Sequence, residues 1–315
     1  MNKIKEQLPF TLDEFVASDL GKHYKGKVRE NFHLDDEIIM VTTDRVSAFD
    51  HVLGTIPFKG QILTEIANFW FDKTKHIVPN HIISSPDPQV LVAKKAETLP
   101  VEVIVRGYIT GSLWREYSSG INGQYGFNLP DDLKMNQKFN EPILTPSTKA
   151  EYGLHDEPID RDSIINGLVE ESIYSQAEQY ALELFSAGQK WAAEQGLILV
   201  DTKYEFGMVN GELIVIDEIH TPDSSRYWVA EEYEKRYAAG ENQKMLDKEN
   251  IRQWLIEKGF SGEGMPPKLT DEIRISLAEK YIELFHILTG SSFEPIVGDV
   301  ATRIYKNLEY AGVST

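Results

Sequence analysis

Three charged residues alternate with other residues along one short stretch of the chain: Asp201, Lys203 and Glu205. Residues spaced two apart in an extended strand point to the same face, so these side chains should lie side by side. Apolar runs at 197–200 and 213–216 indicate that the strands are buried. A buried carboxylate is unfavourable unless it is paired or bound to a metal. The pattern therefore suits a divalent cation beside a polyanion, whereas the alternative is a solvated strand face with ordinary cross-strand ion pairs.

The dipeptide Asn210-Gly211 predicts a hairpin between these two strands, because it is the strongest short turn signal for one. A strict two-residue turn would place Asp217 opposite Tyr204, away from the face that carries Glu205. A three-residue loop or one bulge would place Asp217 opposite Glu205. We predict such an irregularity, because a metal site shared by Glu205 and Asp217 requires both carboxylates on one face.

Cations are concentrated at one place in an otherwise acidic chain. The formal net charge is −18, so anionic substrates need a local basic site. Such a site is supplied within eight residues by Lys22, His23, Lys25, Lys27 and Arg29. The sequence Gly26-Lys27-Val28-Arg29 lacks Walker A spacing, but a glycine turn with two cations could still cover phosphates, as glycine-rich loops do in kinases. The alternative is a basic surface turn.

Two further segments carry groups that suit an anion. Arg106 follows a strand predicted at 99–105 and precedes Ser112, and a guanidinium with a hydroxyl suits phosphate or carboxylate. Lys149 lies in a region without clear periodicity at 120–160. A loop of that length within a compact domain is usually functional or disordered.

The elements that must position these residues change in kind along the chain. Helices are predicted at 11–20, 58–71, 175–195, 247–258 and 271–289. Thr11 and Glu14 form a capping-box pattern in the first of them. Strands are predicted mostly before about residue 105, with a polar turn at 43–50. We therefore expect an α+β protein with a strand-rich N-terminal lobe at 1–104, a mixed C-terminal lobe at 105–315, and a ligand in the cleft between them.

Length and composition exclude several classes of protein. At 315 residues with 41% hydrophobic content, the chain can form a large core. It has no apolar run near the ~18 residues of a membrane span, and its first residues lack the apolar centre of a signal peptide. The absence of cysteine excludes disulfides and thiolate chemistry and agrees with a cytoplasmic protein. The negative charge argues against binding to nucleic acids or anionic membranes.

Seven stretches, taken together and in order, resemble the SAICAR synthetase (phosphoribosylaminoimidazole-succinocarboxamide synthase) family. They are residues 26–29, 43–50, 58–64, 105–112, 144–158, 200–207 and 216–228. The resemblance implies a two-lobed fold related to protein kinases and ATP-grasp enzymes, with ATP between the lobes. It also implies a ligase of purine biosynthesis. Such an enzyme joins L-aspartate to the carboxylate of the aminoimidazole ribonucleotide CAIR to give SAICAR, and splits ATP to ADP and phosphate with Mg²⁺.

The resemblance further implies a nucleotide and metal site. Lys27 and Arg29 would face the ATP phosphates, although some family members carry lysine in place of Arg29. Glu102 and Val103 belong to a segment, 102–105, that would meet adenine chiefly through its backbone. Glu205 and Asp217 would hold Mg²⁺, which commonly binds one or two carboxylates together with phosphate oxygens and water.

The same resemblance implies a site for CAIR and aspartate. The groups around CAIR would be Arg106, Ser112, Asp201, Lys203, Asp223 and Arg226, with Arg106, Ser112 and Arg226 on its phosphate. The catalytic candidates are Lys203, Asp201 and Arg226, and Asp201 is the candidate base. Lys149 and His155, in a loop at 147–156, would help to bind aspartate.

The implied chemistry agrees with the charge pattern. Transfer of the γ-phosphoryl group to the CAIR carboxylate would give an acyl phosphate, which the neutral amine of aspartate would attack. The protein would mainly place and neutralise three anionic reactants. Two alternatives stay open: a kinase of a small phosphorylated or polyhydroxylated substrate on the same fold, and a non-catalytic nucleotide-binding protein. The sequence also leaves open whether the protein is a monomer or a small homo-oligomer.

Overall fold

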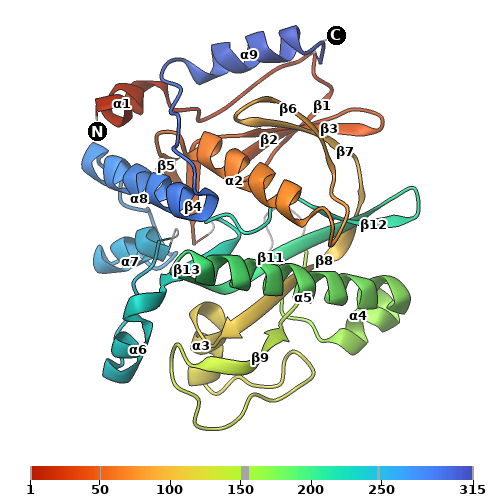
Figure 1. The fold of residues 1–315 in the computed structure, drawn as a ribbon, viewed down its shortest axis with the longest axis vertical. Helices are drawn as coiled ribbons and strands as arrows, with labels where there is room; N and C mark the ends of the chain where they lie inside the picture. The colour runs from red at the N-terminus through yellow and green to blue at the C-terminus, as the bar shows by residue number, and fades with distance from the viewer. Residues whose placement is uncertain (1, 50, 150–155, 247–248, 314–315) are drawn as a thin grey trace. The chain divides into compact units, whose positions relative to one another are not determined.

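The computed structural model describes residues 2–49, 51–149, 156–246 and 249–313 (Figure 1). The chain packs into two compact units. The first comprises residues 1–71, 81–95 and 246–315, and the second comprises residues 72–80 and 96–245. Both contain helices and antiparallel strands, which confirms the α+β class. The functional lobes expected at 1–104 and 105–315 stay a prediction. The two packing units have other boundaries, since residues 246–315 belong to the same unit as the N-terminal sheet.

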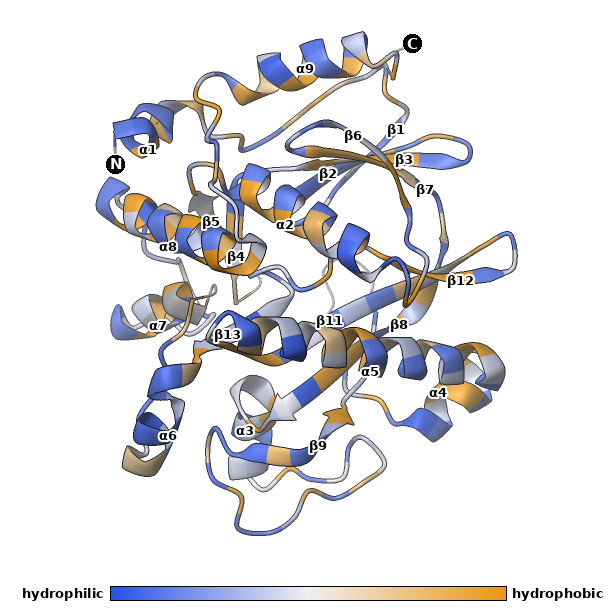
Figure 2. Cartoon of the chain, viewed as in Figure 1, coloured by the Kyte–Doolittle hydropathy of each residue, from blue (hydrophilic) through white to orange (hydrophobic). Residues whose placement is uncertain are grey.

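An antiparallel sheet of five strands forms the centre of the first unit. Its strands, in spatial order, are β1 (Lys22–Lys25), β2 (Arg29–His33), β3 (Glu37–Thr42), β7 (Val90–Lys94) and β6 (Ile82–Asp87). Strands β4 (Arg45–Ala48) and β5 (His51–Thr55) pair separately. Phe32 and Ile39 of the sheet belong to one apolar cluster with Ile304 and Leu308 of helix α9 (Val300–Tyr310). Figure 2 shows hydrophobic and hydrophilic bands alternating along α9, as packing of one helix face requires.

The other helices that begin in the first unit largely follow the predicted periodicity. They are α1 (Asn2–Gln7), the 3-10 turn η1 (Leu8–Phe10), α2 (Lys59–Thr74), α7 (Glu249–Glu257) and α8 (Asp271–Thr289). Three of them confirm the helices predicted at 58–71, 247–258 and 271–289, within the described residues. None of the described helices is long and apolar enough to cross a membrane.

The helix predicted at 11–20 is wrong, because distant partners engage the groups that would open it. The Thr11 hydroxyl lies 2.7 Å from the Thr55 hydroxyl instead of capping its own segment. The backbone N–H of Leu12 donates to the carboxylate of Asp44 at 2.8 Å. Both contacts hold the segment in an irregular conformation against residues more than thirty positions away.

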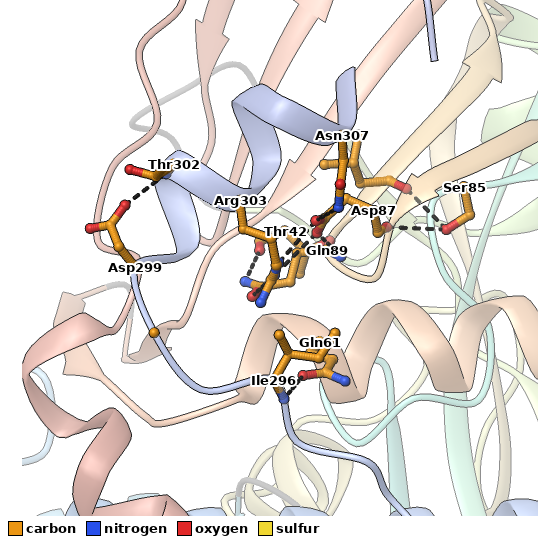
Figure 3. A network of polar contacts seen from close by, with 12 residues as sticks. Thr42, Gln61, Ser85, Asp87, Gln89, Ile296, Asp299, Thr302, Arg303 and Asn307 are labelled. Carbon is orange, nitrogen blue, oxygen red and sulfur yellow. Dashed lines mark hydrogen bonds and ion pairs between the residues drawn. The ribbon is translucent and has the colours of Figure 1, made fainter. Parts of the chain in front are cut away.

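Polar contacts join α9 to the sheet of the first unit (Figure 3). Arg303 donates to both oxygens of Asp87, at 2.9 and 3.1 Å, and Asn307 donates to the same carboxylate at 2.7 Å. Gln89 accepts from Arg303 at 2.8 Å and donates to the carbonyl of Thr42 at 3.0 Å. These bonds help to explain why α9, near the end of the sequence, belongs to the same unit as strands from the first third of the chain.

Gly60, in the first turn of α2, has no room for a side chain. A Cβ atom there would lie 2.3 Å from the amide nitrogen of Gln89 and 2.3 Å from the carbonyl oxygen of Thr42. We expect Gly60→Ala to lower the free energy of unfolding by about 1–3 kcal/mol, the range for overpacking, in urea titrations. Gly167→Ala is the control, because a Cβ at Gly167 would meet nothing within 4 Å. Equal stabilities of the two variants would contradict the close packing at Gly60.

The second unit is built on a sheet with β11 near its centre. The main order is β10 (Ser147–Thr148), β8 (Glu97–Tyr108), β11 (Leu197–Val209) and β12 (Glu212–Ile216). Strand β13 (Ser225–Val229) pairs with β11, and β9 (Lys138–Leu144) pairs with β8. The expectation of irregular structure throughout 120–160 is wrong for β9 and β10, which lack a periodic pattern but complete the edge of the sheet.

Helices cover and extend this sheet. The longest, α5 (Glu171–Glu194), packs on β11 and β8 and confirms the helix predicted at 175–195 (Figure 1). The others are α3 (Gly111–Ser118), α4 (Arg161–Gly167) and α6 (Ala230–Ala239). Buried residues of α5, such as Leu184 and Phe185, face the core, so the long helix fixes the strands that carry the candidate site.

Candidate active site

The register of β11 brings the predicted charged residues together in rows across the sheet. Asp201 lies opposite Arg106 of β8 on one side and opposite Arg226 of β13 on the other. Two strand positions further on, Lys203 follows, and then Glu205 lies opposite Glu102 of β8. Side chains opposite each other on antiparallel strands are close enough to interact. The predicted sharing of one face by Asp201, Lys203 and Glu205 thus extends to both neighbouring strands.

One end of this face is a buried cluster of two guanidinium groups around one carboxylate. Arg106 lies 3.4 Å from Asp201 Oδ2, and the same oxygen accepts from Arg226. Arg106 and Asp201 are each 5% exposed. Arg106 also donates to the hydroxyls of Thr145 at 2.7 Å and Ser112 at 3.3 Å. Two cations and one anion leave a net positive charge, which suits an anionic ligand.

Local backbone geometry makes room for these groups. Gly111 has φ +59°, and a Cβ atom there would lie 2.4 Å from the guanidinium of Arg226. A glycine at the start of α3 therefore permits the close approach of the arginine. Asp201 already contacts two guanidinium groups, so the geometry favours a role in holding Arg106 and Arg226. Its assignment as the base stays a prediction.

The other end of the face is a lysine between two carboxylates. Lys203 Nζ lies 2.6 Å from an oxygen of Glu102 and 2.6 Å from an oxygen of Glu205, and Lys149 pairs with the second oxygen of Glu205. Burial alone would raise the pKa of Glu205, but the charges of Lys203 and Lys149 outweigh it and lower this pKa. Burial would lower the pKa of Lys203, but the two carboxylates raise it. For Glu102, burial prevails and raises the pKa despite Lys203.

The hairpin that carries Glu205 has a strict two-residue turn. Val209 pairs with Glu212, and the register continues unbroken until Glu205 lies opposite Ile216. The predicted bulge or longer loop is therefore wrong. Instead, Asp217 leaves the strand with φ +67°, so strand alternation no longer fixes the direction of its side chain. The left-handed conformation is one that aspartate tolerates better than most residues.

The fit of a metal ion can be judged from the donor set. The charges of Lys203 and Lys149 favour the ionised form of Glu205, which a metal ligand needs, but each of its oxygens already pairs with one of these lysines, so a metal ion has to share or displace them. Within the described ranges, no three carboxylates or histidines are grouped as a metal site. A site made by Glu205 and Asp217 with phosphate oxygens and water needs no third side chain. The pair fits Mg²⁺ in kind, and its role stays a prediction.

The remaining candidates lie in several places. Both Lys27 and Arg29 lie in the first unit: Lys27 is exposed in the turn before β2, and Arg29 is half-buried at the first position of β2. The Val103 side chain is fully buried, which agrees with contact through its backbone alone. Asp223 is half-buried in the loop before β13. His155 lies outside the described residues.

Thr145 is a site residue that sequence reasoning missed as an individual. It precedes Pro146 in a segment whose periodicity is weak, and only the pairing of β9 with β8 places it beside Arg106.

His220, which stands near the acidic residues in the sequence, is fully buried and lies 2.5 Å from the Tyr204 hydroxyl. Burial lowers the pKa of His220 to about 3, so this imidazole is neutral.

Comparisons with known proteins agree with the geometry. A family model described as SAICAR synthetase matches residues 22–267. The phosphoribosylaminoimidazole-succinocarboxamide synthase of Bacteroides fragilis is 51% identical over 291 residues, covering 90% of this chain and 93% of the relative. That of Cytophaga hutchinsonii is 50% identical over 313 residues, covering 98% and 99%.

Solved structures give the same result. A SAICAR synthase from Saccharomyces cerevisiae, complexed with SAICAR, superposes with a TM-score of 0.78 at 34% identity, over 90% of this chain and 100% of that one. A type-2 SAICAR synthetase in complex with ADP has a TM-score of 0.66 at 27% identity, over 87% and 100%. The similarity spans both compact units.

Proposed function

The chain belongs to the SAICAR synthetase family of purine-biosynthetic ligases, and on that premise we propose that it joins CAIR to L-aspartate while ATP is split to ADP and phosphate. The observation that carries the proposal is the arrangement on β8, β11 and β13. Two arginines surround Asp201 there, and Lys203 lies between two carboxylates on the same face. The relatives described in complex with SAICAR and with ADP support the choice of product and nucleotide.

The arginine cluster is proposed as the CAIR phosphate site. Arg106 and Arg226 would each offer a planar fork of N–H donors to the phosphate, and Ser112 would add a hydroxyl. Asp201 would keep both guanidinium groups in place before the substrate arrives. Asp223 would add a polar contact to CAIR.

The lysine–carboxylate cluster is proposed as the reacting end. The CAIR carboxylate would form a bond to the γ-phosphorus as the bond to ADP breaks, and Lys203 would stabilise the negative charge. The neutral amine of aspartate would then attack the carbonyl carbon, phosphate would leave, and the nitrogen would release a proton to a base, for which Asp201 is the candidate, so that an amide would remain. Lys149 would hold a carboxylate of aspartate. Glu205 and Asp217 would hold Mg²⁺, which would supply charge neutralisation for the phosphates when bound.

The nucleotide contacts are proposed separately. Lys27 and Arg29 would contact the ATP phosphates, and the backbone at Glu102 and Val103 would meet adenine. We further propose small-molecule partners only, with no nucleic acid or membrane, and a cytoplasmic location, in keeping with the acidic, cysteine-free sequence.

The test is ADP release by the purified protein with ATP, Mg²⁺ and CAIR, with and without L-aspartate. The expected result is ADP formation that requires both CAIR and aspartate, together with a product heavier than CAIR by one aspartate less one water in mass spectrometry. ADP formed without aspartate would indicate a kinase or uncoupled phosphorylation of CAIR. Chelation of Mg²⁺ should abolish the reaction.

Glu102→Gln tests the positioning of Lys203. The amide keeps the shape of the carboxylate but removes one of the two charges that hold the ammonium, so we expect turnover to fall about tenfold with little loss of stability. Misplacement of a reacting group by ~1 Å can lower rates by up to ~10²-fold. Glu97→Gln, at an exposed position on the same strand, is the control. Equal turnover in the two variants would show that Glu102 does not position Lys203.

A further inference from the structure

Arg45, at the start of β4, is a buried cation whose donors are all used. It is 2% exposed. Its Nε donates to the carbonyl of Lys27 at 2.9 Å, and its Nη2 donates to the carbonyls of Gly26 at 2.9 Å and Arg29 at 3.2 Å. Its Nη1 donates to the carboxylate of Glu30 and to the carbonyl of Asp13. An arginine has five N–H donors, and five acceptors meet them here.

Residues 26–29 form a turn, and three of its four carbonyls accept hydrogen bonds from Arg45. The fourth carbonyl, that of Val28, accepts from the backbone N–H of Thr43 at 3.0 Å and from its hydroxyl at 2.7 Å. Every carbonyl of the turn is therefore bonded to Thr43 or Arg45. The bond from the Thr43 N–H to Val28 continues the pairing of β2 with β3, and the Arg29 carbonyl also accepts from the backbone N–H of Gly26 at 2.8 Å. The three bonds from the Arg45 guanidinium are additional to these backbone bonds.

The orientation of the carbonyls fixes the opposite side of the turn. A trans peptide is planar, so its N–H points away from its own C=O, and none of the described peptides is cis. The N–H groups of Lys27 and Val28 are thus directed away from the Arg45 guanidinium. The Lys27 side chain is exposed on the same turn. Two N–H groups that are directed away from Arg45, beside the Lys27 side chain, suit phosphate oxygens.

The charge of Arg45 is balanced by the carboxylate of Glu30, which lies outside residues 26–29. Glu30 is fully buried, pairs with Arg45, and lies 2.8 Å from His23 Nε2. The ion pair with Glu30 uses one donor of Arg45. The other donors of Arg45 go to backbone carbonyls, three of them in residues 26–29, which points to a role in shaping that turn.

We propose that Arg45 is a positioning residue for the nucleotide: its guanidinium holds the carbonyls of Gly26, Lys27 and Arg29, so that the turn presents the N–H groups of Lys27 and Val28 and the Lys27 side chain to phosphate. The proposal rests on the proposed function, in which this turn contacts ATP. Arg45 acts through the turn and touches no substrate.

Arg45→Lys is the principal test. Lysine keeps the charge for Glu30 but has three donors and no planar fork, so the turn should loosen. Hydrogen exchange of peptides spanning residues 22–33 should be at least about tenfold faster than in the wild type. The KM for ATP should rise at least about tenfold, while the KM values for CAIR and aspartate stay within about twofold. Thr43→Val removes the hydroxyl that donates to the Val28 carbonyl at 2.7 Å and accepts from the Arg45 backbone N–H at 3.4 Å. This variant should shift both readouts in the same direction by about threefold and is available if Arg45→Lys folds poorly.

Arg274→Lys is the matched control. Arg274 belongs to the same unit and also donates to backbone carbonyls, those of Thr55 at 2.7 Å and Leu8 at 3.1 Å, but to none in the turn. The Arg274→Lys variant should lower the melting temperature to a similar degree as Arg45→Lys, without changing the KM for ATP or the rate of hydrogen exchange at residues 22–33.

The outcomes separate this proposal from the proposed function. Unchanged exchange at 22–33 in Arg45→Lys, or an equal rise in KM for all three substrates, would overturn the positioning role. If the wild type shows no ligation of CAIR and aspartate, the proposed function fails. Exchange and the Kd for ADP, by calorimetric titration, then still decide whether Arg45 shapes a nucleotide-binding turn. Faster exchange with weakened ADP binding would support it, and faster exchange with unchanged ADP binding would refute it.

Discussion

Asp217→Asn is expected to lower turnover by at least about 100-fold while the protein stays folded. The substitution removes a negative charge from the proposed metal pair, and charge stabilisation by a bound metal is worth several kcal/mol in the transition state. The backbone should tolerate the change, because Asp217 has φ +67° and asparagine adopts that left-handed conformation as readily as aspartate. The measurement is kcat at saturating Mg²⁺, together with the melting temperature.

The control for this prediction is Glu212→Gln. Glu212 is exposed on the same hairpin, so its substitution removes an equal charge at a place with no proposed metal contact. Turnover of this variant should match the wild type. Turnover of Asp217→Asn close to the wild-type value at saturating Mg²⁺ would refute the metal role of Asp217.

The sequence was most informative where the physical signal is local. Alternation at Asp201, Lys203 and Glu205 placed three side chains on one face, and Asn210-Gly211 located the hairpin turn. The bulge expected in the hairpin was wrong. A register shift does occur beside Glu205, but it lies in the pairing of β11 with β8. Asp217 lies beyond the end of β12 and has a left-handed backbone conformation.

Contacts between distant segments could not be derived in this way. Glu102 and Lys203 are 101 positions apart, and their ion pair depends on the register of two strands that the sequence does not encode locally. The five acceptors of Arg45 likewise lie outside its own strand, so the stretch at 43–50 indicated only a polar turn. The helix expected from the capping-box pattern at Thr11 was wrong because of another contact between distant residues: the backbone N–H of Leu12 donates to the carboxylate of Asp44.

Arg226→Ala is expected to raise the KM for CAIR about 100-fold and to change the KM for ATP by no more than about threefold. Removal of one partner from a buried, hydrogen-bonded charge pair in a binding site typically costs ~2–5 kcal/mol, which brackets this factor. Arg226 is largely buried against Asp201, and Arg106 would remain as the second cation of the cluster. Binding should therefore weaken without the loss of the whole site.

Two companion variants sharpen the interpretation of Arg226→Ala. Arg226→Lys keeps the charge but loses the planar fork, so its KM for CAIR should lie between those of the alanine variant and the wild type. Arg236→Ala removes a more exposed arginine that pairs with Glu232 within α6, and it should leave all three KM values unchanged. Equal losses for CAIR and ATP in Arg226→Ala would assign the arginine cluster to the general stability of the sheet. A loss confined to CAIR would support the assignment of the cluster to CAIR binding, because CAIR is the reactant proposed to contact both guanidinium groups.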